Sequence, residues 1–347
     1  MSKLNWSLTS STPASRAFAV IAAIAVLLLF AAPWLVGRGL IRDLFQIMTL
    51  LVLAQCWNLL AGYAGLISVG QQAFVGVGAY VFFSFAVFLP IPPVMAIFCA
   101  GGVAALIGVA AASFTFRLQG AYFAVGTWVV AEVVQLSLAK QSVLGGGSGM
   151  SLPRDFRESL PGFEVLREFG FSKSATADVI SYWMALALCA LTILVIYRFM
   201  RTPAGLGLGA VRDNVVAARS VGVNATKLKW LVYLGCNFIT GITGALIFLQ
   251  KQRVSPETAF NVVDWSAFVI FVVVIGGIGT IEGPIIGVLV FYLLQNFLAN
   301  LGPIYLIILG LLGIVSILIA PAGLWGLITE KTGITLFPIR NKLRSSR

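Results

Sequence analysis

The sequence predicts an all-α, polytopic membrane protein with about ten transmembrane helices. Of its 347 residues, 59% are hydrophobic and only 10% are charged, and the mean hydropathy is +0.99. Soluble globular domains carry roughly 25% charged residues, so apolar runs of spanning length dominate this chain. Two of these runs are interrupted by clusters of glycine, which indicates helices that break within the membrane.

Ten apolar runs can be placed along the chain, and the glycine-rich interruptions leave eight to ten crossings compatible with the pattern. The first run follows a polar segment, as in a signal peptide, but its length of about 20 residues favours a retained span. The expected spans are 17–36, 41–61, a third that emerges from the first glycine cluster and ends near Pro90, 94–116, 121–139, 179–200, 229–250, 265–281, 284–299 and 303–320.

Basic residues concentrate in two segments, which predicts the orientation of the chain. The segment 201–228 and the C-terminal tail 326–347 carry an excess of Lys and Arg, whereas the charges of the long polar loop 140–178 cancel. Cytoplasmic loops are enriched in Lys and Arg. We therefore expect 201–228, the tail and the N-terminal segment 1–16 in the cytoplasm and 140–178 outside. The transmembrane domain then covers 17–325 of a multi-pass protein of the inner (plasma) membrane.

This topology leaves one mild conflict, because Arg38 and Arg42 would lie outside with only Asp43 to offset them. The formal net charge of +11 could also indicate nucleic-acid binding. The basic residues cluster at the ends of spans, however, and topology explains that distribution better. We expect no nucleic-acid partner.

Residues 204–223 form a polar stretch between two long apolar spans. Its charges and its amide lie within eight positions, after three glycines and before a fourth: Arg212, Asp213, Asn214 and Arg219. This density of polar groups predicts a short helix outside the membrane. An ordinary charged cytoplasmic loop is the alternative interpretation.

The spacing within this stretch favours an amphipathic helix. Apolar residues recur on one helical face, at Val211, Val215 and Ala218. Asp213 would lie in the first turn and Arg219 in the last, as the helix dipole prefers. Gly222 stands where a left-handed cap would end the helix.

Two glycine-rich segments, 62–78 and 276–284, mark the broken helices. A break in a spanning helix must be buried in protein or line a watery cavity, because lipid offers no partner for a free backbone group. Paired breaks of this kind mark transport pathways, although glycines can also serve only to let helices pack closely. The candidate pathway residues are Asn58, Gly62, Tyr63, Gly65, Ser68, Gln71, Gln72, Gly277, Gly279, Thr280 and Glu282.

The polar side chains of the first break have two interpretations. They could line a path for a solute, or they could only satisfy carbonyl groups freed by the broken helix. Glu132, near the middle of the fifth expected span, should face the bundle interior or a partner, because an exposed carboxylate in lipid costs about 2.5–3.5 kcal/mol. A structural pairing is favoured over a transport role.

The sequence lacks the residues and motifs on which common metal sites, catalytic sites and ATP-binding loops depend. There is no histidine, and the four cysteines contain no C-x-x-C pair, so we expect no metal site and no catalytic residues. The phosphate-binding pattern G-x-x-x-x-G-K-[ST] is missing as well, so this chain is not expected to bind ATP through a P-loop.

Four motifs resemble those of the branched-chain amino acid ABC transporter permeases, and most closely the LivM-type subunit. The similarity extends from about residue 40 to residue 325. It rests on 58–74 (NLLAGYAGLISVGQQAF), 205–222 with its AVRDNVVAAR core, 274–284 (VIGGIGTIEGP) and the external 145–153 (GGGSGMSLP).

The resemblance implies a non-catalytic subunit of an importer for branched-chain or related amino acids. An external solute-binding protein would deliver the solute, a second, LivH-type permease subunit would complete the membrane part, and two cytoplasmic ATPase subunits would bind ATP in place of any cofactor of this chain. The residues implied in coupling to the ATPase are Arg212, Asp213, Asn214, Ala217, Ala218, Arg219 and Gly222.

Other functional classes remain open at this stage. An ion-coupled secondary transporter of a small polar solute also uses broken helices, and Glu132 is the only carboxylate well inside a span. An ABC permease for urea or amides shares the same pattern. A membrane-embedded enzyme ranks below both, and the residues do not name the solute.

Overall fold

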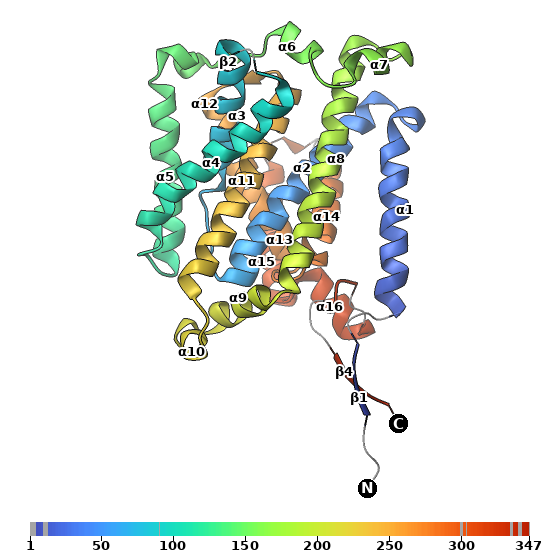
Figure 1. The fold of residues 1–347 in the computed structure, drawn as a ribbon, viewed down its shortest axis with the longest axis vertical. Coiled ribbons are helices and arrows are strands. Elements are labelled where there is room, and N and C mark those ends of the chain that lie inside the picture. Colours follow the sequence, from blue (N-terminus) through green and yellow to red (C-terminus); the bar gives the residue numbers. More distant parts are fainter. Residues whose placement is uncertain are drawn as a thin grey trace.

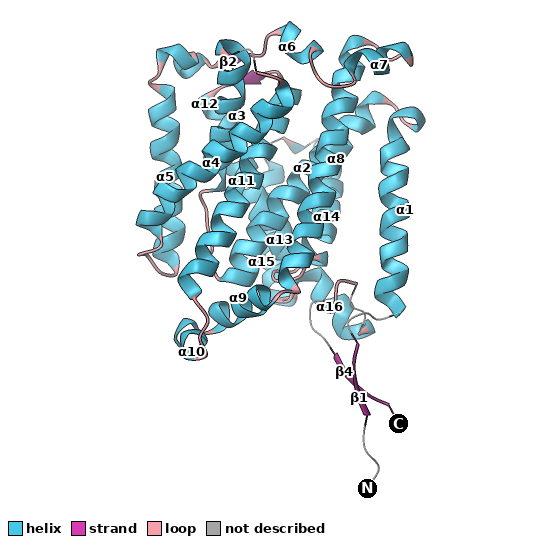
Figure 2. Ribbon diagram, in the orientation of Figure 1, coloured by secondary structure: helices cyan, strands magenta, loops and turns pink. Residues whose placement is uncertain are grey.

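The computed structural model of the chain describes residues 5–9, 13–89, 91–298, 301–302, 304–333, 336–338 and 342–346, with side chains described from Ala17 to Pro338. This part of the chain is almost entirely helical, as expected (Figure 2). Nine of its helices are long and apolar enough to cross a membrane, and a tenth apolar helix is shorter. The prediction of an all-α protein with eight to ten crossings is confirmed.

The spanning helices follow the predicted order closely. They are α1 (Pro13–Leu35), α2 (Arg38–Asn58) with the π-helical turn η1 (Leu59–Tyr63), α3 (Gln71–Phe88), α4 (Pro93–Thr115), α5 (Ala121–Ala139), α8 (Lys173–Met200), α11 (Ala225–Lys251), η4 (Val263–Ala267) with α13 (Phe268–Gly276), α14 (Glu282–Leu298) and α15 (Ile304–Ile319). Some predicted limits of spans lie outside the described residues, namely Pro90 and residues 299 and 303. The tail residues Arg340 and Arg347 lie outside them as well.

Short elements connect these helices at the two ends of the bundle. One group comprises η2 (Ser142–Leu144), η3 (Gly146–Ser148), β2 (Met150–Ser151), α6 (Arg154–Glu158), α7 (Phe163–Glu168), β3 (Arg253–Val254) and α12 (Pro256–Ala259). The other comprises β1 (Asn5–Thr9), α9 (Pro203–Asp213), α10 (Val215–Ser220), α16 (Gly323–Thr332) and β4 (Lys342–Ser346). The antiparallel pairs are β1 with β4 and β2 with β3.

The two groups of connections lie at opposite ends of the bundle (Figure 1). The end with α9, α10 and α16 also carries β1 and β4, near the two termini, whereas α6, α7, β2 and α12 lie at the other end. The segments predicted to share one side of the membrane are therefore grouped at one end, and the loop 140–178 lies at the opposite one. We call these the coupling end and the loop end.

Helices α2, α3 and α11 form the interior of the bundle, and α1 and α5 stand at its flanks (Figure 1). Small residues allow α3 and α11 to approach closely, as is common in membrane proteins. A Cβ atom on Gly78 would lie 2.0 Å from the carbonyl oxygen of Gly241, and one on Gly244 would lie 2.2 Å from that of Val75. These helices are in close backbone contact, and α3 follows the first glycine-rich segment directly.

The structure resolves the conflict over the two arginines expected at the loop end. The Nε atoms of Arg38 and Arg42 lie 2.5 and 3.0 Å from the carboxylate of Asp178, whose side chain is only 4% exposed. Asp43 instead accepts a hydrogen bond from the hydroxyl of Tyr292. The compensating negative charge is that of Asp178 on α8, about 140 residues further along the chain. Counting charges among neighbouring positions in the sequence does not reveal such a pair.

A proline within α1 explains how α1 is attached to α8. Pro33 has no N–H and cannot donate to the carbonyl of Leu29, one turn earlier. The hydroxyl of Tyr182 donates to that carbonyl at 2.7 Å, and the indole of Trp183 donates to the carbonyl of Phe30 at 3.0 Å. Within the membrane, α8 thus supplies the donor that the proline removes.

We expect the substitution Tyr182→Phe to lower the free energy of unfolding by about 1 kcal/mol, the usual scale of an interhelical hydrogen bond in a membrane. Tyr122→Phe is the matched control, because Tyr122 is 77% exposed on α5. Equilibrium unfolding in detergent micelles measures both variants. Equal stability of the two variants would show that the bond to Leu29 adds nothing.

Candidate functional site

The two glycine-rich breaks lie against each other, joined by one asparagine. The first break comprises the π-helical turn η1 and residues 64–70, which lead into α3, and the second break comprises residues 277–281, between α13 and α14. The side-chain amide of Asn58 donates from Nδ2 to the carbonyl of Thr280 at 2.7 Å, and its Oδ1 accepts from the N–H of Gly279 at 2.7 Å. Asn58 is 1% exposed, so a single buried amide satisfies two backbone groups of the second break.

A second amide from the same helix supports this arrangement. Gln55 donates from Nε2 to the carbonyl of Ile281 at 2.7 Å. Three consecutive residues of the second break therefore find their partners on α2. No sequence pattern marks Gln55, because it lies outside the glycine cluster and within an apolar run.

The polar residues of the first break are buried and hold the break in place. The carbonyl of Ser68 accepts from the indole of Trp57 at 2.7 Å, and the amide of Gln71 donates to the carbonyl of Leu53 at 3.0 Å. Gln72 accepts from the hydroxyl of Ser266. The Oγ atom of Ser68 accepts from the N–H of Gly70 at 3.3 Å. Satisfying backbone groups of the breaks, one of the two interpretations of these side chains, thus accounts for the bonds of Asn58 and Ser68.

Glycine is needed where the two breaks touch. A Cβ atom on Gly62 would lie 2.5 Å from the backbone nitrogen of Gly279 and 2.6 Å from Oδ1 of Asn58. Gly65 and Gly279 have φ angles of +69° and +78°, a region that L side chains rarely adopt. Gly277, with φ of +130°, opens the second break directly after α13. The two glycine-rich segments therefore meet in a single contact, at Gly62 and Gly279.

Helix α9 is tied directly to this contact. Arg212 donates from a terminal guanidinium nitrogen to the carbonyl of Gly62 at 2.8 Å, and its Nε lies 2.9 Å from the carboxylate of Asp213. The same guanidinium nitrogen lies 3.5 Å from the Cβ position of Gly279. One arginine of the extramembrane segment thus reaches both breaks, a connection between residues 150 positions apart.

The segment between α8 and α11 contains two helices, so the prediction of one continuous helix was wrong. Asn214 separates α9 from α10 with φ of −157° and ψ of 109°, and its Oδ1 accepts from the N–H groups of Val216 and Ala217 at 3.0 Å. An asparagine side chain that caps the following helix competes with continuation of the preceding one. Asp213 therefore ends α9 and does not lie in a first turn.

Other features of this segment were predicted correctly. Gly222 has φ of +87°, and its N–H bonds the carbonyl of Arg219 at 3.0 Å, so it ends α10 as expected. The predicted apolar face also exists across the break: Val211 and Ala218 are buried together with Ala225, and Val215 packs against them.

In the coupling segment, residues 203–222, all but one of the residues implied in coupling to the ATPase are exposed to solvent. Ala218 is 2% exposed and packs against Val211 and Ala225, so its side chain does not lie on the outer surface. The exposed candidates are Arg212, Asp213, Asn214, Ala217, Arg219 and Gly222.

A cavity of about 1050 Å³ opens at the coupling end, between α9, the second break, α16 and residues 337–338. Arg212, Asp213, Thr280 and Glu282 line it, together with Tyr63. The hydroxyl of Tyr63 is buried and has no hydrogen-bond partner among the described atoms. The cavity therefore combines both charge signs with a free hydroxyl, next to the contact between the breaks.

Glu282, the first residue of α14 directly after the second break, is bound by residues 336 and 337. It is 6% exposed, and its Oε1 accepts from the N–H groups of Leu336 and Phe337 at 3.1 and 2.8 Å. The ring of Phe337 packs edge-on against Tyr197, with 5.4 Å between centroids. No periodic pattern in the sequence indicated that residues 336–338 return to the site.

Glu132 lies away from this site. It is on the flanking helix α5, half-buried, and it accepts from the indole of Trp128 at 3.0 Å. This partner is one turn earlier on the same helix, so the predicted structural pairing is the one observed.

Broken helices in mutual contact are typical of polytopic transport proteins. Residues 39–320 match the family described as branched-chain amino acid transport system / permease component. This is most of the chain, so the chain belongs to that family. The resemblance found in the sequence is confirmed.

Relatives with this description occur in bacteria and archaea. The chain is 28% identical over 324 residues to the high-affinity branched-chain amino acid transport system permease protein LivM of Escherichia coli, covering 87% of this chain and 73% of the relative. For the LivM protein of Salmonella typhimurium the identity is 27% over 314 residues, covering 84% and 71%. A probable LivM protein of Methanocaldococcus jannaschii is 27% identical over 240 residues, 65% of each chain.

We expect Gly62→Ala to lower the free energy of unfolding by about 1–3 kcal/mol, because the added methyl group forces the two breaks apart. Gly102→Ala on α4 is the control, since its Cβ would meet nothing within 4 Å. Thermal unfolding midpoints in detergent compare the variants. If both unfold at the wild-type temperature, the tight contact between the breaks does not exist.

Proposed function

We propose that this chain is the permease subunit of an ATP-binding-cassette importer for branched-chain or related amino acids. The bond from Arg212 to the carbonyl of Gly62 is the observation that carries the proposal, because it joins an exposed segment to the broken helices. The names of the relatives, branched-chain amino acid transport system permease proteins, support the solute class. The subunit itself is non-catalytic, and separate cytoplasmic ATPase subunits bind and hydrolyse ATP.

The coupling segment docks on the ATPase subunits through its exposed residues. Movement of the ATPases displaces α9, and Arg212 transfers that displacement to Gly62 and to the second break. Two packed arrangements of the bundle would then open the path alternately to each side. Ala218 supports the segment from the bundle side, and the coupling end with both termini faces the cytoplasm.

The solute passes beside the two breaks. A zwitterionic amino acid suits half-helix ends, which offer partial positive and negative charge, and the cavity at the coupling end provides the exit. Tyr63, Thr280 and Glu282 contribute polar atoms there. An external solute-binding protein docks at the loop end, over 140–178, and a second LivH-type permease subunit completes the pathway.

Uptake by the complete complex in proteoliposomes tests this proposal. We expect uptake of leucine to require internal ATP and the ATPase subunits and to be indifferent to ion gradients. Uptake driven by a gradient without ATP would support a secondary transporter instead. The position of Glu132, bonded to Trp128 on a flanking helix, already weakens that alternative. Competition by urea or amides, with none by leucine, would identify a different solute class.

We expect Arg212→Ala to lower ATP-driven uptake by about tenfold or more, since a charge-assisted hydrogen bond contributes roughly 1.5–3 kcal/mol. Lys227→Ala is the matched control, because it removes an exposed positive charge at the same end of the bundle. Co-purification of the ATPase establishes that each complex assembles. Equal uptake by the two variants would refute the coupling role of Arg212.

A further inference from the structure

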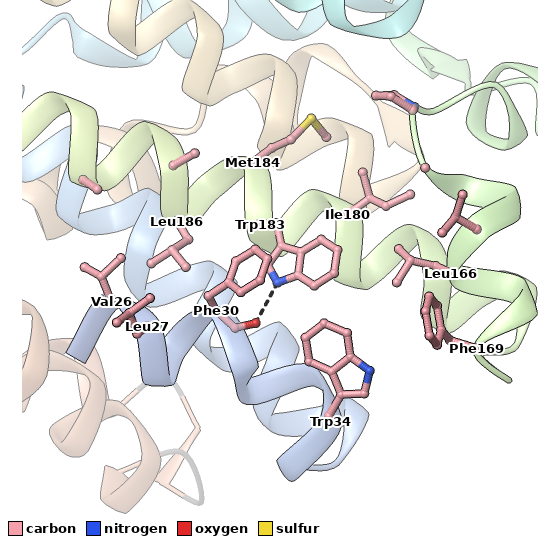
Figure 3. Close-up of a pocket in the computed structure, with 15 residues that line it drawn as sticks. Val26, Leu27, Phe30, Trp34, Leu166, Phe169, Ile180, Trp183, Met184 and Leu186 are labelled. Carbon is pink, nitrogen blue, oxygen red and sulfur yellow. Dashed lines mark hydrogen bonds between the residues drawn. The ribbon is translucent and has the colours of Figure 1, made fainter. Parts of the chain in front are cut away.

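Two further cavities lie in the bundle. The larger, of about 800 Å³, lies between α1, α7 and α8, and none of the described residues that line it is charged (Figure 3). The indole N–H of Trp183 in its wall is already bonded to the carbonyl of Phe30, so a zwitterionic solute finds no partner there. The smaller, of about 240 Å³, is lined by charges of both signs. We call this one the loop-side cavity.

The loop-side cavity lies on the helices that carry the two breaks, between the breaks and the loop end. Its walls come from α2, the end of α11, η4 with α13, and α14. Thr49 in its wall is about 14 Å from Asn58 along the axis of α2, and Phe291 is as far from Glu282 along α14. The breaks therefore separate this cavity from the one at the coupling end. A solute that enters from the loop end meets the loop-side cavity first.

The loop-side cavity contains one carboxylate and one ammonium group, those of Asp264 and Lys251. The two charges are close enough to interact electrostatically, but neither belongs to an ion pair within 4.0 Å among the described side chains, and the Asp264 carboxylate accepts no hydrogen bond from a described group. The Nζ atom of Lys251 lies 4.8 Å from the centre of the Trp265 ring and 5.3 Å from that of Phe248. Cation–π contacts leave its N–H donors available, so both charges can bind a ligand.

A buried amide and apolar walls complete the loop-side cavity. Nε2 of Gln250 is buried and has no hydrogen-bond partner among the described atoms, and such a donor costs free energy until it is paired. The indole of Trp265 is fixed by a hydrogen bond to the carbonyl of Thr258 at 2.9 Å. At about 30 Å³ per water molecule, the cavity has room for about eight waters, which suits a small solute. Its apolar lining includes Phe45, Leu50, Ile247 and Phe268.

We propose that the loop-side cavity binds the amino acid when it enters from the loop end, before it reaches the breaks. Asp264 binds the α-ammonium group, Lys251 and the amide of Gln250 bind the α-carboxylate, and the apolar walls enclose the side chain. An α-amino acid carries both charges on one carbon atom, so a single ligand pairs all three groups. This inference rests on the proposed function for the class of solute, and it gives the chain a binding site of its own.

Equilibrium binding of tritiated leucine to the purified full chain in detergent, without ATP or ATPase subunits, tests the site. Leucinol keeps the ammonium group and lacks the carboxylate, whereas isocaproate keeps the carboxylate and lacks the ammonium group. We expect each analogue to compete about tenfold or more weakly than leucine does, because each loses a charge-assisted contact. No leucine binding, or competition by either analogue as strong as that by leucine, would overturn the site.

Two substitutions separate the charged contacts. Asp264→Asn should weaken the binding of leucine and leucinol by about tenfold or more without weakening that of isocaproate. Lys251→Gln should weaken the binding of leucine and isocaproate by a similar factor without weakening that of leucinol. Glu257→Gln and Lys140→Gln remove exposed charges at the same end of the bundle, and these controls should bind all three ligands as wild type does.

The pattern of loss distinguishes a binding role from a structural one. A purely structural role of Asp264 or Lys251 does not depend on which charge the ligand carries. Equal loss of all three ligands in either variant, or loss of none, would therefore contradict the assignment.

The site and the proposed function fail in different ways. ATP-driven uptake of leucine by the complete complex, with no leucine binding by the purified chain, would refute the site and leave the proposed function intact. Uptake driven by an ion gradient would refute the proposed function, while charge-selective binding in the two variants would still support the site.

Discussion

The two hydrogen bonds of Asn58 are the interaction on which the architecture of the site depends. Within a membrane, every backbone group freed by a broken helix needs a partner from protein or enclosed water. Asn58 supplies both a donor and an acceptor to the second break. Its helix also carries Gln55 and continues into the π-helical turn of the first break. Without this amide, the second break would be left with an unpaired donor and acceptor in an apolar bundle.

This constraint also explains why the coupling segment can act on the site. Arg212 binds a carbonyl of the same π-helical turn that touches Gly279, so α9 and the two breaks form one contiguous network. Each hydrogen bond between membrane helices contributes about 0.6–2 kcal/mol. Bonds of that size can be exchanged between two arrangements of the bundle. The closely packed contact between α3 and α11, by contrast, resists deformation and can serve as the fixed part.

Much of the fold follows from local signals in the sequence. The apolar runs located the spans, the distribution of basic residues grouped the ends correctly, and the glycine clusters marked both breaks. Gly222 ended its helix as expected, because a left-handed cap depends on one residue. The break at Asn214 was not predicted, because an asparagine within an apparently helical pattern can either remain in the helix or cap a new one.

The parts that the sequence did not predict are contacts between distant positions. Asp178 forms ion pairs with Arg38 and Arg42. Tyr182 donates a hydrogen bond to the carbonyl of Leu29, which Pro33 leaves without a donor. Glu282 accepts hydrogen bonds from the N–H groups of residues 336 and 337. Each of these pairs joins residues more than 50 positions apart, and single-sequence periodicity carries no information on such pairs. The role of Arg212 was expected at the outer surface, whereas its guanidinium also reaches inward to the breaks.

Hydrogen exchange of the segment 276–284, measured by mass spectrometry in the Arg212→Ala variant, tests most directly whether the coupling segment and the breaks form one unit. If Arg212 holds Gly62 against the second break, its loss will increase exchange at 276–284 and leave α4 unchanged. Identical exchange of 276–284 in the variant and the wild type would show that α9 does not control the breaks, and the account would fail.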